Sequence, residues 1–287
     1  MSNEAENAAR RSYWTAKMDE AFAFMGKIRQ YPVNECGEPV VSLVDAASAA
    51  GVEVAFSDRP HVQGLPRLYW LRAGLIDSFI RCAREMNERG WILKVEDAFR
   101  TVTMQKFLAR APHTFDYIVE RVFWECNGAQ PPVDLLARRV AALVAAAPKV
   151  GTHMSGSAID ISVLDRATGQ EIDRGRPYLE MSELTPMDSP FISAEAAANR
   201  AEITALMGKH GFVTYPWEFW HYNQGDAYDQ YLNQTGKAAQ YGAVHISLSN
   251  GNVQPIEAPL TSLNSSEEME SEMRQALERR NQRMDQA

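Results

Sequence analysis

The sequence predicts a fold that mixes α-helices with β-strands, and three segments carry this prediction. Residues 74–89 repeat apolar side chains at helical spacing, and Gly90 follows as a helix stop. Residues 91–97 (WILKVED) come next and are typical of a strand. Residues 157–163 alternate with a period of two, so Asp160 lies on the opposite face from its isoleucine neighbours.

Further elements are expected on both sides of these segments. Helices are predicted at residues 13–28, 102–109, 133–147 and 194–210, and short strands at residues 51–56 and 212–215. The face of the first helix is expected to carry Trp14, Met18, Phe22 and Met25, and Ser193 is expected to cap the fourth. Residues 40–50 fit either a strand or a helix, and residues 170–193 are expected to be irregular.

The composition is that of an ordinary soluble globular protein and excludes several classes. With 287 residues the chain can form one large domain or two modest ones. A net charge of −8 argues against a nucleic-acid partner or an anionic membrane surface. No apolar run is long enough for a membrane span or a signal peptide, so a cytoplasmic location is expected.

The three cysteines, Cys36, Cys82 and Cys126, are widely spaced and form no metal-type pair. We expect free, mostly buried thiols, and from these a reducing compartment. The oligomeric state cannot be deduced from these features.

Two motifs carry the candidate chemistry, residues 151–160 (GTHMSGSAID) and residues 217–221 (WEFWH). They supply His153, Asp160 and His221, and two histidines with a carboxylate can hold a catalytic zinc that keeps one position open for water. The other acidic residue, Glu218, is of the type that takes the water's proton. Spacing leaves open whether Glu218 or His221 is the ligand. Both can converge on one site only if the chain bends tightly between them.

A carboxylate and a guanidinium, Asp97 and Arg100, lie at the end of the strand predicted at residues 91–97. Arg100 is the candidate for stabilising an oxyanion, and Asp97 is placed to orient Arg100 or to contact the substrate. The remaining histidines lack such partners and are expected to be structural or surface residues. They are His61, His113, His210 and His245.

Taken together and in order, these motifs resemble those of the zinc D-alanyl-D-alanine dipeptidases, within the larger D-Ala-D-Ala peptidase group. Residues 97–100 (DAFR), 153–160 (HMSGSAID) and 218–221 (EFWH) are similar to that family's D-x-x-R, S-x-H-x-x-G-x-A-x-D and E-x-W-H motifs. The similarity extends over roughly residues 65–223, with the intervening segments in the same order.

The resemblance implies an α+β fold in which helices surround a small central antiparallel sheet, the D-Ala-D-Ala metallopeptidase or Hedgehog-like fold. It implies one zinc ion bound by His153, Asp160 and His221, with Glu218 as the catalytic acid/base and Arg100 at the oxyanion. The implied domains are an N-terminal extension (1–60) packed on the core, a zinc peptidase domain (61–250) and a mobile or helical C-terminal tail (251–287).

The sequence departs from the family pattern at three places. Gly151 stands where the family has a serine, and Thr101 stands where a proline often follows the motif arginine. The family's acidic residue that helps hold the substrate's ammonium falls near Leu179, and the adjacent Glu180 is the candidate for that role. Two of these changes concern recognition of the substrate's amino end.

The expected function is zinc-dependent hydrolysis of a small peptide bond, with D-Ala-D-Ala as the leading substrate and metal-bound water attacking the carbonyl. An alternative keeps this chemistry in a carboxypeptidase or an amidase that acts on a different peptide-like substrate. A third reading is a non-catalytic metal-binding module, which has no need of Glu218 or Arg100.

Overall fold

The structure, a computed structural model, describes residues 3–285. Its helices are α1 (Asn3–Gln30), α2 (Leu43–Ala50), α3 (Ile76–Glu88), α4 (Val102–Leu108), α5 (Pro112–Glu125), α6 (Val133–Leu143), α7 (Ala194–Lys209), α8 (Ala227–Leu232) and α9 (Ser266–Asp285). Its strands are β1 (Val40–Ser42), β2 (Val54–Phe56), β3 (Trp70–Arg72), β4 (Trp91–Asp97), β5 (Ala158–Asp165), β6 (Val213–Thr214), β7 (His221–Asn223), β8 (Val244–Ile246) and β9 (Val253–Pro255). Short 3-10 helices include η3 (Pro148–Val150) and η4 (Thr152–Ser155).

The largest sheet has five strands in the order β2-β4-β5-β7-β6. Its central pairs are antiparallel, as expected, but β2 runs parallel to β4. The two strands can run parallel because the chain passes through β3 and α3 between them. This crossover is long enough to return the chain to the edge of the sheet where β2 began. The predicted α+β class is confirmed, and the sheet is mixed at its edge rather than wholly antiparallel.

One face of this sheet packs against α3 and α7 and forms the sheet core. Alternate residues of β5, Ile159 to Val163, point into this core together with Phe79 of α3 and Met207 of α7. The period-two pattern of β5 therefore places Asp160 on the other face, as the sequence predicted. That other face meets the helical layer.

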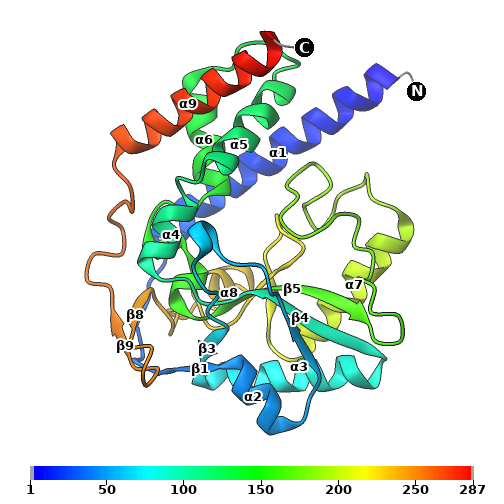
Figure 1. Cartoon of the computed structure of the whole chain (residues 1–287), viewed down its shortest axis with the longest axis vertical. Helices are drawn as coiled ribbons and strands as arrows, with labels where there is room; N and C mark the ends of the chain where they lie inside the picture. Colours follow the sequence, from blue (N-terminus) through cyan, green and yellow to red (C-terminus); the bar gives the residue numbers. More distant parts are fainter. Residues whose placement is uncertain (1–2, 286–287) are drawn as a thin grey trace.

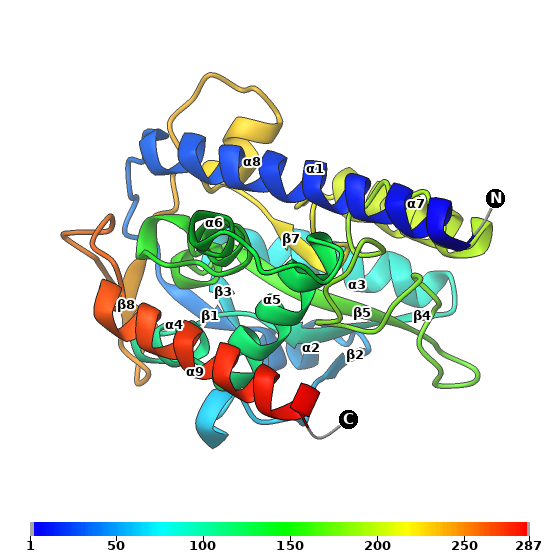
Figure 2. The same ribbon diagram turned by 90° about the horizontal axis from the view of Figure 1, so that it is seen from above.

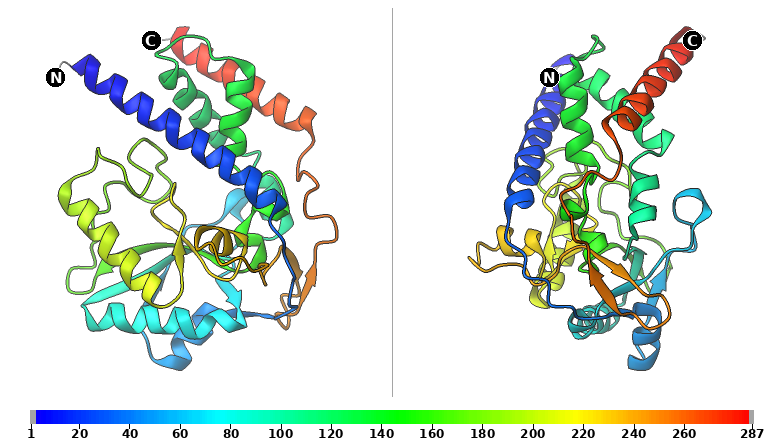
Figure 3. Two further views of the ribbon diagram at one scale, coloured as in Figure 1. Left: turned by 180° about the vertical axis from the view of Figure 1, so that it is seen from behind. Right: turned by 90° about the vertical axis from the view of Figure 1, so that its left-hand side faces the viewer.

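The helical layer consists of α1, α5, α6 and α9. These helices occupy the upper part of Figure 1, where both ends of the chain also lie, and the sheet with α3 occupies the lower part. Figure 3 shows the same division from behind and from the side. Seen from above in Figure 2, α5 lies between α6 and α9, and α5 packs against both.

The helical layer has a hydrophobic core of its own, built by α5, α6 and α9. It contains Phe115, Val119 and Phe123 of α5, Leu136 of α6 and the fully buried Ala276 of α9. None of these residues belongs to the sheet core. Residues 266–285, charged as they are, thus form a helix that is held on the fold by packing against α5.

The first helix is longer than predicted and is turned differently. Its buried stripe runs through Trp14, Met18, Ala21 and Ile28, whereas Phe22 is 39% exposed. The predicted face was therefore wrong at Phe22. Buried positions follow one another at three- and four-residue steps along the helix, and Phe22 does not fall on one of these steps.

Two helices in the middle of the chain depart from expectation. The predicted helix at 133–147 ends earlier, at Leu143, where Val144 is already extended (φ −128, ψ 122). Helix α5, which begins with Pro112 at its first turn, was not predicted. Residues 40–50 contain both alternatives, β1 followed directly by α2.

The three cysteines are unpaired, as predicted, but only Cys82 is buried and Cys36 is exposed. Between residues 3 and 285, no helix combines the length and apolar character needed to cross a membrane.

Candidate metal centre

Three neighbouring strands bring acidic and imidazole side chains to one place on the sheet. Asp160 of β5 pairs with Asp97 of β4 on one side and with His221 of β7 on the other. The register of β4 shifts between Val95 and Asp97, so the end of that strand is irregular. The sheet alone therefore gathers two of the three predicted ligands.

The third predicted ligand, His153, lies in η4, immediately before β5. Gly156 ends η4 with φ +68, and a Cβ there would lie 3.0 Å from a methyl of Val40 and 3.4 Å from the Phe99 ring. Only glycine suits this left-handed and crowded turn. The buried guanidinium of Arg72 donates from Nε to the Ser155 carbonyl at 2.5 Å, which ties the η4 loop to β3.

The ligand atoms of the trio converge. Nδ1 of His221 lies 2.8 Å and Nε2 of His153 lies 3.2 Å from the same oxygen, Oδ1 of Asp160. All three side chains are buried, and their candidate ligand atoms lie within 4.8 Å of one another. The two imidazole rings are nearly perpendicular, with centroids 4.9 Å apart.

Hydrogen bonds to the outer ring nitrogens fix which nitrogen faces the centre. Nδ1 of His153 is 2.5 Å from the Ala98 carbonyl, which can only accept, so Nδ1 carries a proton and Nε2 is the nitrogen that faces the centre. Nε2 of His221 is 3.0 Å from the Thr152 hydroxyl, which leaves Nδ1 toward Asp160. Such outer contacts are the usual support of metal-binding histidines.

Asp160 is buried but strongly favoured in its charged form. Burial alone would raise its pKa, but the contacts with His153 and His221 hold the pKa well below the ordinary value. Its second oxygen, Oδ2, accepts a hydrogen bond from Tyr178 at 2.8 Å and faces Arg100 Nη2 at 3.4 Å. One carboxylate oxygen is thus free to serve a cation while the other is held by protein.

Glu218 reaches the same site from a tight turn. Its backbone N–H donates to the Tyr215 carbonyl at 3.1 Å, and the N–H of His221 donates to the Glu218 carbonyl at 3.1 Å. This turn supplies the bend that convergence of Glu218 and His221 requires. Burial raises the pKa of Glu218 to about 7, with His221 opposing the rise. Such a pKa is typical of a proton-transfer group near neutral pH.

Arg100 is held at the rim of the trio by Asp97. Its Nε donates to Asp97 Oδ2 at 2.7 Å, and its Nη1 lies 3.4 Å from Gln105 Oε1. Asp97 also pairs with Arg67 at 3.1 Å, and His61 lies 3.5 Å away. Burial would raise the pKa of Asp97, but Arg100 beside it keeps that pKa well below its ordinary value.

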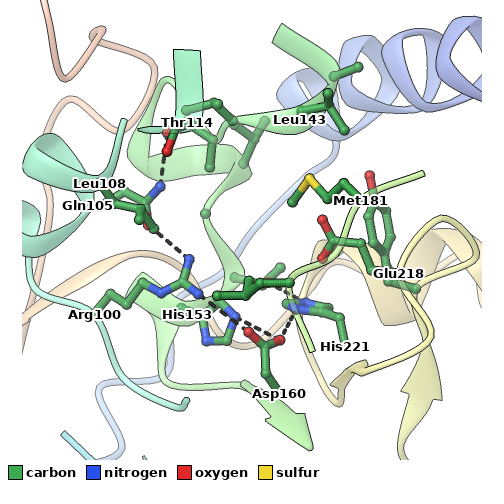
Figure 4. A pocket seen from close by; sticks show the side chains of 18 of the residues that line it. Arg100, Gln105, Leu108, Thr114, Leu143, His153, Asp160, Met181, Glu218 and His221 are labelled. Carbon is green, nitrogen blue, oxygen red and sulfur yellow. Dashed lines mark hydrogen bonds and ion pairs between the residues drawn. The ribbon is translucent and has the colours of Figure 1, made fainter. Parts of the chain in front are cut away.

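A cavity of about 420 Å³ opens over the trio, between the sheet and the helical layer. Figure 4 shows Asp160, His153 and His221 at its base, Arg100 on one side and Glu218 on the other. Its lining includes all five of these residues, but neither Asp97 nor Glu180.

The two predicted substrate contacts therefore lie away from the cavity lining. Asp97 is 1% exposed and is committed to Arg100 and Arg67. Glu180 forms an ion pair with Arg176 at 3.1 Å instead of facing the trio. Gly151 does line the cavity, and a Cβ there would lie 3.4 Å from the Met154 sulfur, an ordinary contact.

Three residues in or beside the site were not identified from the sequence: Thr152 and His113, which line the cavity, and Tyr178, which donates a hydrogen bond to Asp160. Tyr178 lies in an irregular segment with no periodic signal, and Thr152 was hidden beside the more conspicuous His153. His113, expected to be structural or on the surface, lines the cavity from the first turn of α5. No spacing or periodicity in the sequence indicated any of these three residues.

The donor set fits a zinc ion. Ligand atoms bound at about 2.0–2.2 Å to one zinc lie within about 4 Å of each other, close to the spacing among His153, Asp160 and His221. Two neutral imidazoles and one carboxylate leave a net positive site when a divalent ion binds, and the cavity provides access for a further ligand.

Comparison with known proteins agrees with this geometry. The sequence profile of the family described as D-ala-D-ala dipeptidase matches residues 84–240, more than half of the chain. A D-alanyl-D-alanine dipeptidase of Synechocystis sp. is 27% identical over 247 residues, covering 74% of this chain and 94% of that protein.

Shorter alignments join two more proteins with the same name. That of Enterococcus faecium is 34% identical over 71 residues (25% of this chain, 35% of the relative), and that of Escherichia coli is 31% identical over 97 residues (33% and 50%). The solved structure of the LdcB LD-carboxypeptidase is 17% identical with a TM-score of 0.37, covering 73% of this chain and 80% of that one. By its sequence, the chain belongs to the D-ala-D-ala dipeptidase family of zinc-dependent metallopeptidases.

Proposed function

We propose that this protein binds one zinc ion through His153, Asp160 and His221 and hydrolyses a peptide bond in a small substrate. The observation that carries the proposal is the convergence of these three buried side chains at the base of a cavity that also contains the Glu218 carboxylate. When bound, zinc supplies Lewis acidity, which makes a water molecule nucleophilic near neutral pH.

Glu218 is proposed to move the proton. In its charged form it takes a proton from the attacking water, and it then passes that proton to the leaving amine. Its raised pKa, near 7, suits both transfers, because neither the charged nor the neutral form is strongly disfavoured. A bound cation would favour the charged form and lower this pKa.

Arg100 is proposed to stabilise the negative charge that develops on the carbonyl oxygen. Asp97 fixes the guanidinium through Nε, and the long 3.4 Å contact to Gln105 leaves Nη1 available to donate to a substrate oxygen. A fixed donor of this kind needs no reorganisation during the reaction. Asp97 is thus assigned to positioning rather than to contact with the substrate.

The names of the relatives make D-Ala-D-Ala the first substrate to test. A related carboxypeptidase or amidase activity on another peptide-like substrate is the second candidate, since Glu180 pairs with Arg176 and does not line the cavity.

The proposal is tested by metal content and turnover together. Purified protein should contain about one zinc per chain, and Glu218→Gln should keep that zinc while turnover falls by about 10²–10⁴-fold. Glu202→Gln, at an exposed position on α7, is the matched control and should retain full activity. Protein that takes up no zinc on reconstitution, or a Glu218→Gln variant with unchanged turnover, would contradict the proposal.

A further inference from the structure

The cavity has no uncommitted acidic side chain that could pair with the ammonium group of a substrate. Among the described residues that line it, only Asp160 and Glu218 carry a carboxylate. Asp160 is committed to the two histidines, Tyr178 and Arg100, and Glu218 is the proposed base. In a free dipeptide the ammonium is one carbon from the scissile carbonyl, so it enters the cavity with that bond. An ammonium buried without a carboxylate partner is costly.

The walls above the metal ligands are instead largely apolar, although Gln105, His113, Thr114 and Tyr117 also line them. Leu108, Ile118 and Leu143 contribute from α4, α5 and α6, and Met181 contributes from the irregular segment that follows β5. Figure 4 shows Leu108 and Leu143 across the cavity from the trio, and Met181 beside Glu218. A volume of about 420 Å³ falls within the roughly 300–1,000 Å³ of sites that enclose small organic ligands.

Leu179 completes this wall at the cavity's edge. Its side chain is 51% exposed, and its backbone has φ +68, a left-handed conformation that is disfavoured for residues with a Cβ. The preceding residue, Tyr178, is anchored by its hydrogen bond to Asp160. An exposed leucine held in a strained conformation beside a site is a candidate ligand contact.

One buried, unpaired polar group among the lining residues is neutral. Tyr215 lines the cavity, and its buried hydroxyl has no hydrogen-bond partner within residues 3–285. A phenolic hydroxyl is neutral near pH 7. It can bond to an amide carbonyl of a substrate, but it cannot neutralise an ammonium.

We propose that the preferred substrate has an uncharged amino side, acylated or peptidyl, with a bulky apolar group that contacts Leu179 and the apolar wall. This inference rests on the proposed zinc peptidase function and narrows its substrate class. Free D-Ala-D-Ala, with its ammonium and small methyl groups, is then a poor substrate.

Four compounds separate the two parts of the proposal: D-Ala-D-Ala, D-Leu-D-Ala, N-acetyl-D-Ala-D-Ala and N-acetyl-D-Leu-D-Ala, each also as the L,L isomer. With zinc-loaded full-length protein, kcat/KM for N-acetyl-D-Leu-D-Ala or its isomer should exceed that for the matching free alanine dipeptide by at least about tenfold. Free alanine dipeptides cleaved equally well or better would overturn this inference and leave the proposed function intact.

Substitutions of Leu179 test the contact itself. Leu179→Asp should raise the ratio of kcat/KM for the free dipeptide to kcat/KM for its acetylated form by about fivefold. This is the size expected for a partly exposed ion pair between the new carboxylate and the substrate ammonium. Leu179→Asn tolerates the same left-handed backbone without adding charge, so it should not favour the free amine. Leu248→Asp, at an exposed leucine in the β8–β9 turn, controls for net charge and should leave the ratio unchanged.

Two further outcomes are decisive. An unchanged ratio in Leu179→Asp, with the variant folded and zinc-loaded, would remove Leu179 from the substrate site and overturn the inference. Cleavage of no compound by wild-type protein that holds zinc would contradict the proposed function, and this inference with it.

Discussion

Thr152 is the residue whose role is most sharply defined by the contacts around the metal centre. Its hydroxyl lies 3.0 Å from Nε2 of His221, the nitrogen that faces away from Asp160. Both partners are buried, so water does not readily replace this hydrogen bond. Thr152 thereby fixes the ring orientation of His221.

Replacing Thr152 by the isosteric valine should weaken zinc binding about 10–100-fold, because the outer support of a ligand histidine is lost. A competition titration with a chromophoric chelator measures the change in Kd. Thr152→Ser keeps the hydroxyl and should stay close to the wild-type value. A valine variant with wild-type zinc affinity would show that this hydrogen bond does not support the ligand.

At the residue scale, the sequence allowed the candidate ligands and catalytic groups to be proposed, but not the residues that hydrogen-bond to them. His153, Asp160, His221, Glu218 and Arg100 could be proposed because their types and order match a family of known chemistry. Thr152 and Tyr178 could not, because a hydroxyl that supports a ligand has no characteristic spacing. Glu180 pairs with Arg176 and does not line the cavity, an arrangement that cannot be deduced from the aperiodic sequence of residues 170–193.

A buried ion pair joins three helices of the helical layer. Arg139 of α6 is 1% exposed, donates from Nε to Glu125 of α5 at 2.9 Å and from Nη1 to Asp19 of α1 at 2.7 Å. Thr15 of α1 also donates to Glu125, at 2.9 Å. The arginine is thus desolvated and depends on its carboxylate partners.

Glu125→Ala should lower the free energy of unfolding by about 3–5 kcal/mol, because the substitution leaves the buried Arg139 guanidinium without its main carboxylate partner. The loss should lie toward the lower value, since Asp19 remains. Urea denaturation measures this change. Glu120→Ala on the same helix breaks only the exposed pairs with Arg280 and Arg283 and should cost about 0–1 kcal/mol. Equal losses in the two variants would refute the special role of Arg139.

A second ionic contact, between α3 and α7, gives a pH-dependent prediction. Hydrogen bonds from Lys209, His210 and Arg89 lower the pKa of Glu85 to about 2. Because the folded-state pKa lies below the ordinary value of 4.5, Glu85 stabilises the fold above that value, and the contribution disappears as the pH falls toward 2.

Glu85→Gln should therefore be less stable than wild type at pH 7, and the difference should shrink between about pH 4.5 and 2. Urea midpoints measured across this range test the prediction, with Glu88→Gln, an exposed position on α3, as the control. A difference that stays constant with pH would mean that ionisation of Glu85 does not contribute.

At the element scale, strongly periodic segments were predicted well. Strand β4 was predicted at its observed bounds, and α3, α4 and α7 within two residues of theirs. Helix α5 was missed, because local pattern does not show that Pro112 begins a helix. The helix predicted at residues 133–147 was too long, because its apolar pattern continues past Leu143, where the chain becomes extended. The parallel pairing of β2 depends on a crossover of the chain, which no local pattern reveals.

For the whole molecule, zinc binding should contribute to stability, because the ligands come from elements that meet only in the folded state. At free zinc about 100-fold above Kd, the stabilisation should be about 2.7 kcal/mol. Thermal melts with zinc and after removal by a chelator measure it, and His153→Ala should show no such difference. A melting temperature that does not respond to zinc in wild type would indicate that the ion does not bind the folded chain.

The division between sheet core and helical layer has a dynamic consequence. The proposed ligands belong to the sheet and to η4, whereas part of the apolar wall belongs to α5 and α6, whose own core shares no residue with the sheet core. Regions with separate cores open in separate cooperative units. Transient opening of the helical layer would therefore admit substrate or release product while the ion stays bound, and a substrate that touches both regions would make them open as one.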